Sequence, residues 1–85
     1  MGERGDEVRL AARALLARVR PHALERAETP ATGGALAEAN ALLVLARGAV
    51  PESPLIAAMR PLEAGSTLAE LTTRLAALER AITFV

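Results

Sequence analysis

Few side chains in this sequence of 85 residues have the chemistry that catalysis needs. His22 is the only histidine, the residue type that most readily takes up and releases a proton near neutral pH, and it stands beside Pro21. Cysteine is absent, which removes thiol catalysis, disulfides and thiolate metal sites together. A metal ion would need ligands besides His22, and no second histidine is present. We therefore expect no enzyme activity, no cofactor and no metal site.

Carboxylates and one amide are the next candidates for a catalytic site. The neighbouring carboxylates Asp6 and Glu7 belong to a polar stretch, where we expect both to be solvated. Glu38 and Asn40 stand out more, because the segment around them is almost entirely apolar. They fall on different sides of a helix, so we expect them at the edge of a buried helix and not in a catalytic site.

A stripe of arginines is the one candidate for binding an anion. At about 100° per residue, Arg9, Arg13 and Arg20 fall within a narrow sector of a helix. Asp6 and Glu7 partly cancel the local field, and ten Arg balance ten acidic residues in the whole chain. A net charge of zero gives no long-range attraction to nucleic acid or to an anionic membrane. We therefore do not expect nucleic acid as the main partner.

The composition predicts an all-α fold. The chain is 52% hydrophobic, and 20 Ala and 14 Leu supply most of that fraction. Both residues are strong helix formers, whereas β-branched and aromatic residues are scarce. A chain of this length forms one domain, residues 1–85, in which we expect residues 1–5 to be disordered. A core of Leu and Ala without aromatic residues buries little area per contact, which favours oligomerisation.

The least polar segment runs from Ala35 to Ala46 and predicts a central helix over about 35–47. Apolar residues lie on nearly every side of it, so the rest of the chain, or a partner, must cover it. A strand over Leu42–Leu45 is the alternative, and its Ala-rich flanks argue against it. We expect a small bundle of four to five helices packed around this central helix.

Capping signals place the other helices. A first helix is predicted to begin with Asp6 as its N-cap. Because Pro21 follows Arg20, we expect the helix to kink or to end near Arg20, and a second short helical segment to continue to about Glu28. Thr32, or a glycine after it, caps the central helix, which Gly48 ends. Ser53 and Pro54 predict a short helix to about Arg60.

The last helix has the clearest pattern. Thr67-x-x-Glu70 is a capping box. Apolar residues then recur at spacings of three and four, as at the a and d positions of a heptad, and Arg74 and Glu79 fall at g and e, where they would pair two parallel chains. The run covers only about two and a half heptads, so the stripe packs either on the protein's own central helix or between chains. The predicted interface comprises Leu68, Leu71, Leu75, Leu78, Ile82, Val85, Arg74 and Glu79.

We expect no targeting segment in this sequence. The start of the chain is polar and partly acidic, unlike a secretory signal, and the longest nearly uncharged run of about a dozen residues is too short for a bilayer. We expect a cytoplasmic protein without a membrane segment.

These patterns favour a non-catalytic role in assembly. We expect an adaptor that acts through helix–helix contacts, either as a homo-oligomer or as a minor subunit or chaperone of a larger partner, with a second copy as the first candidate. The alternative is a small nucleic-acid-associated regulator, of the antitoxin or repressor kind, that uses the Arg stripe of the first helix.

Overall fold

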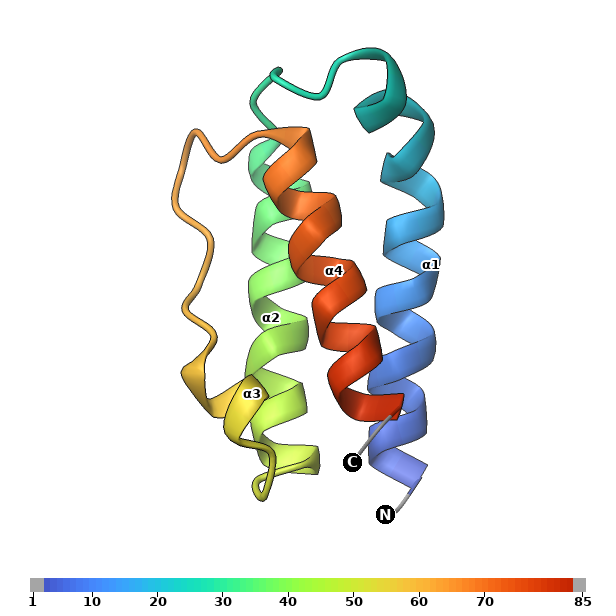
Figure 1. Ribbon diagram of the computed structural model, residues 1–85, viewed down its shortest axis with the longest axis vertical. Helices are drawn as coiled ribbons and strands as arrows, with labels where there is room; N and C mark the ends of the chain where they lie inside the picture. The colour runs from blue at the N-terminus through green and yellow to red at the C-terminus, as the bar shows by residue number, and fades with distance from the viewer. Residues whose placement is uncertain (1–2, 84–85) are drawn as a thin grey trace.

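Four helices form the fold, and three of them lie side by side along its length (Figure 1). The computed structural model describes residues 3–83, with α1 at Glu3–Glu25, α2 at Gly33–Ala49, α3 at Pro54–Ala58 and α4 at Leu68–Thr83. Residues 59–66, which we call the connector, run back along the bundle, so α2 and α4 point in the same direction and α1 opposes both. The prediction of a small all-α bundle is confirmed.

Three of the predicted helix starts are confirmed by their hydrogen bonds. The Thr32 side chain accepts from the Ala35 N–H at 3.1 Å, and the Ser53 side chain accepts from the Ile56 N–H at 3.3 Å. At α4 the capping box is complete. The Glu70 N–H donates to the Thr67 hydroxyl oxygen at 3.1 Å, while the Thr67 N–H donates to the Glu70 carboxylate at 2.9 Å.

The first helix departs from the prediction at both ends. It begins at Glu3, so the N-cap at Asp6 is wrong, and the part of the predicted disordered segment that the structure describes, residues 3–5, is helical. Asp6 still lies in the first turn, where a negative charge stabilises the helix dipole.

At the other end α1 continues through Pro21, so the alternative of an end near Arg20 is wrong, and the helix stops at Glu25, short of the predicted Glu28. Pro21 removes a hydrogen bond to the carbonyl of Ala17. Both residues are exposed, so water can satisfy that carbonyl.

The core is built around α4, which lies across α1 and α2 (Figure 1). Its residues Leu71, Leu75 and Leu78 are completely buried, and Ile82 is 1% exposed. The side chains of the other helices that pack around them are Val8, Ala12, Leu15, Leu16 and Val19 from α1, Leu36, Ala39, Leu42, Leu43 and Ala46 from α2, and Ile56 from α3.

The apolar helix α2 is only partly covered by this chain. Leu42 and Leu43 are buried, but Val44 and Leu45, which follow directly, are 64% and 58% exposed. The chain's own helices therefore cover one side of α2. The helix also runs through Gly48, so the predicted end there is wrong, and Val50 is the C-cap.

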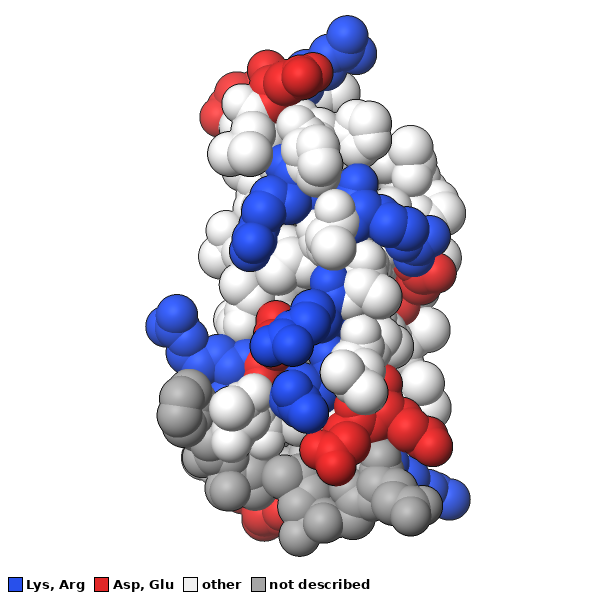
Figure 2. All heavy atoms as spheres, turned by 90° about the vertical axis from the view of Figure 1, so that its right-hand side faces the viewer, with Lys and Arg blue, Asp and Glu red and all other residues white. Residues whose placement is uncertain are grey.

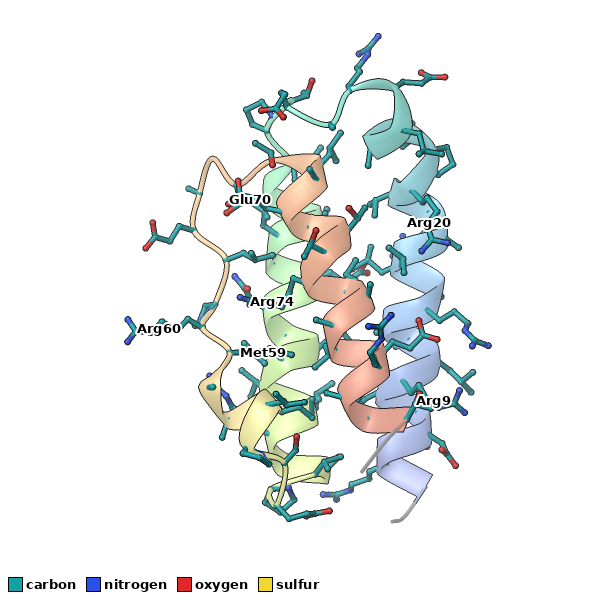
Figure 3. The ribbon with its side chains drawn as sticks, viewed as in Figure 1. Arg9, Arg20, Met59, Arg60, Glu70 and Arg74 are labelled. Atoms are coloured by element: carbon teal, nitrogen blue, oxygen red, sulfur yellow. The ribbon has the colours of Figure 1, made fainter. Side chains whose placement is uncertain are left out.

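The connector is held against the bundle by polar side chains. Arg47 of α2 donates to the carbonyl of Met59, and Arg74 of α4 donates to the carbonyl of Arg60. Figure 3 shows Arg74 directed from α4 toward the connector, whereas the side chain of Arg60 points away from the bundle. The connector turns at Gly65, whose φ of 93° lies in the region that glycine adopts without strain.

The loop after α1 closes the start of α4. The N–H groups of Leu68 and Ala69 donate to the carbonyls of Thr29 and Ala27, at 2.8 Å and 3.0 Å. The first N–H groups of α4 are thereby satisfied within the chain, which leaves this helix end closed to an anion.

Candidate protein-docking face

The predicted interface residues of the last helix lie mainly inside the protein. Because Leu71, Leu75, Leu78 and Ile82 are buried by the chain's own helices, they are not available to a partner. Of the two alternatives for the stripe, packing within the chain is the one that these four residues adopt. Leu68 is half-buried and packs against the same core, while Val85 lies outside the described residues.

The two charged residues of the predicted interface also have partners within the chain. Arg74 donates to the carbonyl of Arg60 in the connector. Glu79 accepts from Arg13 of α1 at 2.9 Å, and its side chain is only 18% exposed. The predicted pairing of these charges between two parallel chains is therefore replaced by contacts that tie α4 to its neighbours.

The Arg stripe lies on the face that α1 presents to solvent. Arg9 is 3.7 Å from Asp6, and Arg13 is bound by Glu79. Only Arg20 of the stripe has no ion pair within the part of the chain that the structure describes. Arg13 and Arg20 line, with Arg80, a shallow groove of about 350 Å³ between α1 and α4. Figure 2 shows basic side chains spread over this face with uncharged surface between them.

The remaining polar candidates have structural roles or lie in solvent. His22 is exposed. Glu38 accepts a hydrogen bond from Arg18, which joins α2 to α1. Asn40 is half-buried and binds the main chain of Leu62 through both atoms of its amide. Among residues 3–83, no three His, Asp or Glu side chains are grouped as a metal ion would require.

Exposed aliphatic side chains identify a different face. Val44 and Leu45 line a groove of about 550 Å³ between the first half of α1 and the second half of α2. A contiguous apolar patch often marks an interaction site, whereas single exposed apolar residues are ordinary; Val44 and Leu45 adjoin the other apolar residues that line this groove. We call this surface the α1/α2 face, and its residues are Arg4, Glu7, Val8, Ala11, Leu42, Val44, Leu45, Gly48 and Ala49.

The α1/α2 face has the shape and chemistry of a helix-docking surface. Two long helices border it, and small residues such as Ala11 and Gly48 allow another helix to approach closely. The two charged residues of the face, Arg4 and Glu7, come from the first turns of α1, and the Arg18–Glu38 ion pair lies beyond the groove, further along the same two helices. An apolar middle between polar ends is typical of a protein interface.

A second apolar groove lies between α3 and α4. Its volume is about 620 Å³, and Leu55, 65% exposed, and Met59 contribute to its lining. Within α3 the core buries Ile56, which leaves Leu55 in contact with solvent. One side of this groove is formed by a helix of only five residues. A partner helix would therefore make a shorter contact here than on the α1/α2 face.

Sequence reasoning missed Val44 and Leu45 as surface residues although a signal was present. A helix that is apolar on nearly every side has more apolar surface than two or three Ala-rich neighbours cover. The heptad pattern in the last helix is more regular than the pattern in α2. The interface was therefore predicted at the last helix, at residues that the chain's own helices bury.

None of the helices among residues 3–83 combines the length and the apolar character needed to cross a lipid bilayer. Comparisons with models of known families, with curated proteins and with solved structures find no match to this chain.

Proposed function

We propose that this is a non-catalytic cytoplasmic assembly or adaptor protein that docks a helical protein surface through its α1/α2 face. The observation that carries the proposal is the pair Val44 and Leu45, which lies exposed along a groove between two long helices. The occupant is either a second copy of the chain or a larger partner that it serves as a minor subunit or chaperone.

The energetics of the exposed pair favour such a contact. Complete burial of a Val or Leu side chain is worth about 1.5–3 kcal/mol. More than half of each side chain remains to be buried, so covering both would contribute about 2–3 kcal/mol before the costs of association are counted. The docking contact would also complete the cover that α2 lacks within the chain.

The alternative, a nucleic-acid-associated regulator, has less support. Two of the three arginines in the stripe are engaged by carboxylates, which lowers the positive potential that phosphates would meet. A catalytic role also has little support, because His22 is exposed and the Glu38 carboxylate is engaged by Arg18.

Affinity capture with matched variants tests the proposal. The tagged protein would be expressed in its natural source beside an untagged copy, as wild type, Leu45→Glu and Leu24→Glu. Leu24 is 82% exposed and lies outside the α1/α2 face, so its variant is the control for added charge. We expect a protein retained in stoichiometric amount by the wild type and by Leu24→Glu, and lost by Leu45→Glu.

The proposal is wrong if the retained protein is insensitive to Leu45→Glu, or if Leu24→Glu removes it equally. It is also wrong if the wild type retains neither the untagged copy nor another protein in stoichiometric amount. Circular dichroism of the two variants verifies that each remains helical.

A further inference from the structure

We propose that α3 and the connector form a strap that opens as one unit while the three long helices stay packed. The strap comprises residues 51–65, which follow Val50, the C-cap of α2, and precede Ser66. Figure 1 shows it running along one side of the bundle, from the end of α2 back to the start of α4. The opening does not depend on whether the α1/α2 face binds a partner, and it gives the fold a second conformation.

The main chain of the strap is not bonded to the main chain of the long helices. All of the strap is described by the structure, and each of its main-chain hydrogen bonds joins residues three or four apart, such as Ala57 to Ser53 at 3.1 Å. The loop after α1 differs, because its carbonyls accept from the N–H groups of Leu68 and Ala69 at 2.8 Å and 3.0 Å. The strap can therefore open without breaking a main-chain hydrogen bond to α1, α2 or α4.

Side chains make the polar contacts that hold the strap. Asn40 binds the main chain of Leu62, and Arg47 and Arg74 each donate to one further carbonyl of the connector. Both arginine contacts are exposed to solvent, and Figure 3 shows Arg74 directed from α4 toward the connector. Water can replace exposed hydrogen bonds at low cost, which is typical of segments that open locally.

Little apolar surface holds the strap. Ile56 is its one completely buried apolar side chain, whereas Leu55 is 65% exposed and Met59 and Leu62 are half-buried. Each of the three long helices contributes five buried side chains to the core. These helices therefore keep most of their mutual packing when the strap leaves, so opening costs less free energy than unfolding of the whole chain.

The length of the strap allows it to open while both of its ends stay in place. It runs back along α2, whose 17 residues are about 25 Å long, and it reaches about 50 Å when fully extended. At one end Val50 is 1% exposed, and at the other the Ala31 N–H donates to the Ser66 carbonyl at 2.8 Å. Gly65, with a φ of 93°, directly precedes the second anchor, and we place a hinge there because glycine changes its backbone angles without strain.

The opening changes the surface along α4. The strap forms one wall of two grooves beside this helix, and Met59 lines both of them. Pro54 and Leu55 line the groove of about 620 Å³, and Leu62 lines a groove of about 400 Å³. Both grooves exist only while the strap is closed. Opening removes them and brings to the surface the part of the core that Ile56 covers.

Hydrogen exchange of the intact protein, followed by NMR one amide at a time, tests the strap. The N–H groups of Ile56, Ala57 and Leu62 report on it, because each donates a hydrogen bond in the closed form. Those of Leu75 and Leu78 report on the core. After correction for intrinsic rates, we expect the strap amides to exchange at least about 100-fold faster than the core amides, and within about threefold of one another.

Leu15→Ala separates opening of the strap from unfolding of the chain. Leu15 lies in α1 and is 3% exposed, so its truncation should speed exchange of the core amides at least about 30-fold. The Leu15 side chain stays packed when the strap opens, so exchange at Ile56 should change less than about threefold. If this variant does not fold, the wild type in dilute urea makes the same distinction. Opening exposes less surface than unfolding, so exchange at Ile56 should rise less steeply with urea than exchange at Leu75.

Asn40→Ala tests whether α3 and the connector move together. The variant removes both hydrogen bonds to Leu62, and we expect exchange at Ile56 and Ala57, which Asn40 does not bind, to rise at least about fivefold. Glu38→Ala is the control on the same helix. It breaks the exposed ion pair with α1 and should change exchange at these two amides less than about threefold.

Strap amides that exchange as slowly as the core would overturn the proposal, because the chain would then open only by unfolding as a whole. Equal acceleration of strap and core amides by Leu15→Ala would lead to the same conclusion. Exchange at Ile56 that Asn40→Ala leaves unchanged would show that α3 opens without the connector, which overturns the strap as one unit.

Discussion

The side chain of Asn40 and the main chain of Leu62 exchange two hydrogen bonds across 22 residues of sequence. The Asn40 amide donates to the Leu62 carbonyl at 3.0 Å, and the Leu62 N–H donates to the Asn40 amide oxygen at 2.7 Å. The pair joins the middle of α2 to the connector. It also explains why a polar residue stands in the least polar helix of the chain, since only an amide offers a donor and an acceptor in this fork.

Asn40→Ala should lower the free energy of unfolding by about 1–3 kcal/mol, because both main-chain groups of Leu62 lose their partner in a half-buried place. Urea denaturation followed by circular dichroism measures the change.

Asn40→Asp is the matched control for this prediction. The carboxylate still accepts from the Leu62 N–H, but it sets an oxygen against the Leu62 carbonyl where the amide donated a hydrogen bond. We expect this variant to be destabilised at neutral pH as well. If both variants unfold at the wild-type urea concentration, the amide fork does not hold the connector.

Leu75→Ala should cost about 2–5 kcal/mol, because it empties a completely buried position in the centre of α4. Leu45→Ala is the matched comparison on the α1/α2 face and should cost less than about 1 kcal/mol in the monomer, since the Leu45 side chain is largely in water there. Denaturation at protein concentrations below those of association measures both. Equal costs would show that α4 is not the centre of the core.

Glu70→Ala should destabilise α4 by about 0.5–2 kcal/mol, because the Thr67 N–H loses its acceptor in the capping box. Glu70→Gln keeps an acceptor oxygen at the same position and should retain most of the stability. Thermal unfolding of the two variants separates the hydrogen bond from the charge. A Gln variant as unstable as the Ala variant would show that the charge of Glu70, and not its hydrogen bond, stabilises the helix start.

Duplex DNA should not be retained by the protein at about 0.15 M salt, because Asp6 and Glu79 neutralise two arginines of the stripe. Fluorescence anisotropy with a labelled duplex measures this. Salt-dependent binding that is lost in an Arg9→Ala, Arg13→Ala variant would support the nucleic-acid alternative instead.

The ends of the helices were well predicted where a side chain caps the backbone locally. Thr32, Ser53 and Thr67 each bond to an N–H three residues further along, so the signal and its structural effect lie in the same short segment. The course of the chain past Pro21 depends instead on whether the carbonyl of Ala17 faces water. That depends on the packing of α1, which local sequence does not contain.

The docking face was not predictable from periodicity alone. The stripe from Leu71 to Ile82 shows that one side of α4 is apolar, but nothing in its spacing tells whether the cover comes from the same chain. The partner of Asn40 is equally hidden, since it is a main-chain group in the connector. The sequence of α2 is apolar on nearly every side, which indicated that part of its apolar surface would stay uncovered. That this part includes Val44 and Leu45 follows only from the way α4 packs across α2.

Methyl NMR over a dilution series tests the role of the α1/α2 face most directly. In protein labelled at the Leu and Val methyl groups, we predict that the resonances of Val44 and Leu45 shift with concentration, while those of Leu71, Leu75 and Leu78 in the core do not. The opposite pattern, with the α4 leucines shifting and Val44 and Leu45 constant, would contradict the assignment of the docking face.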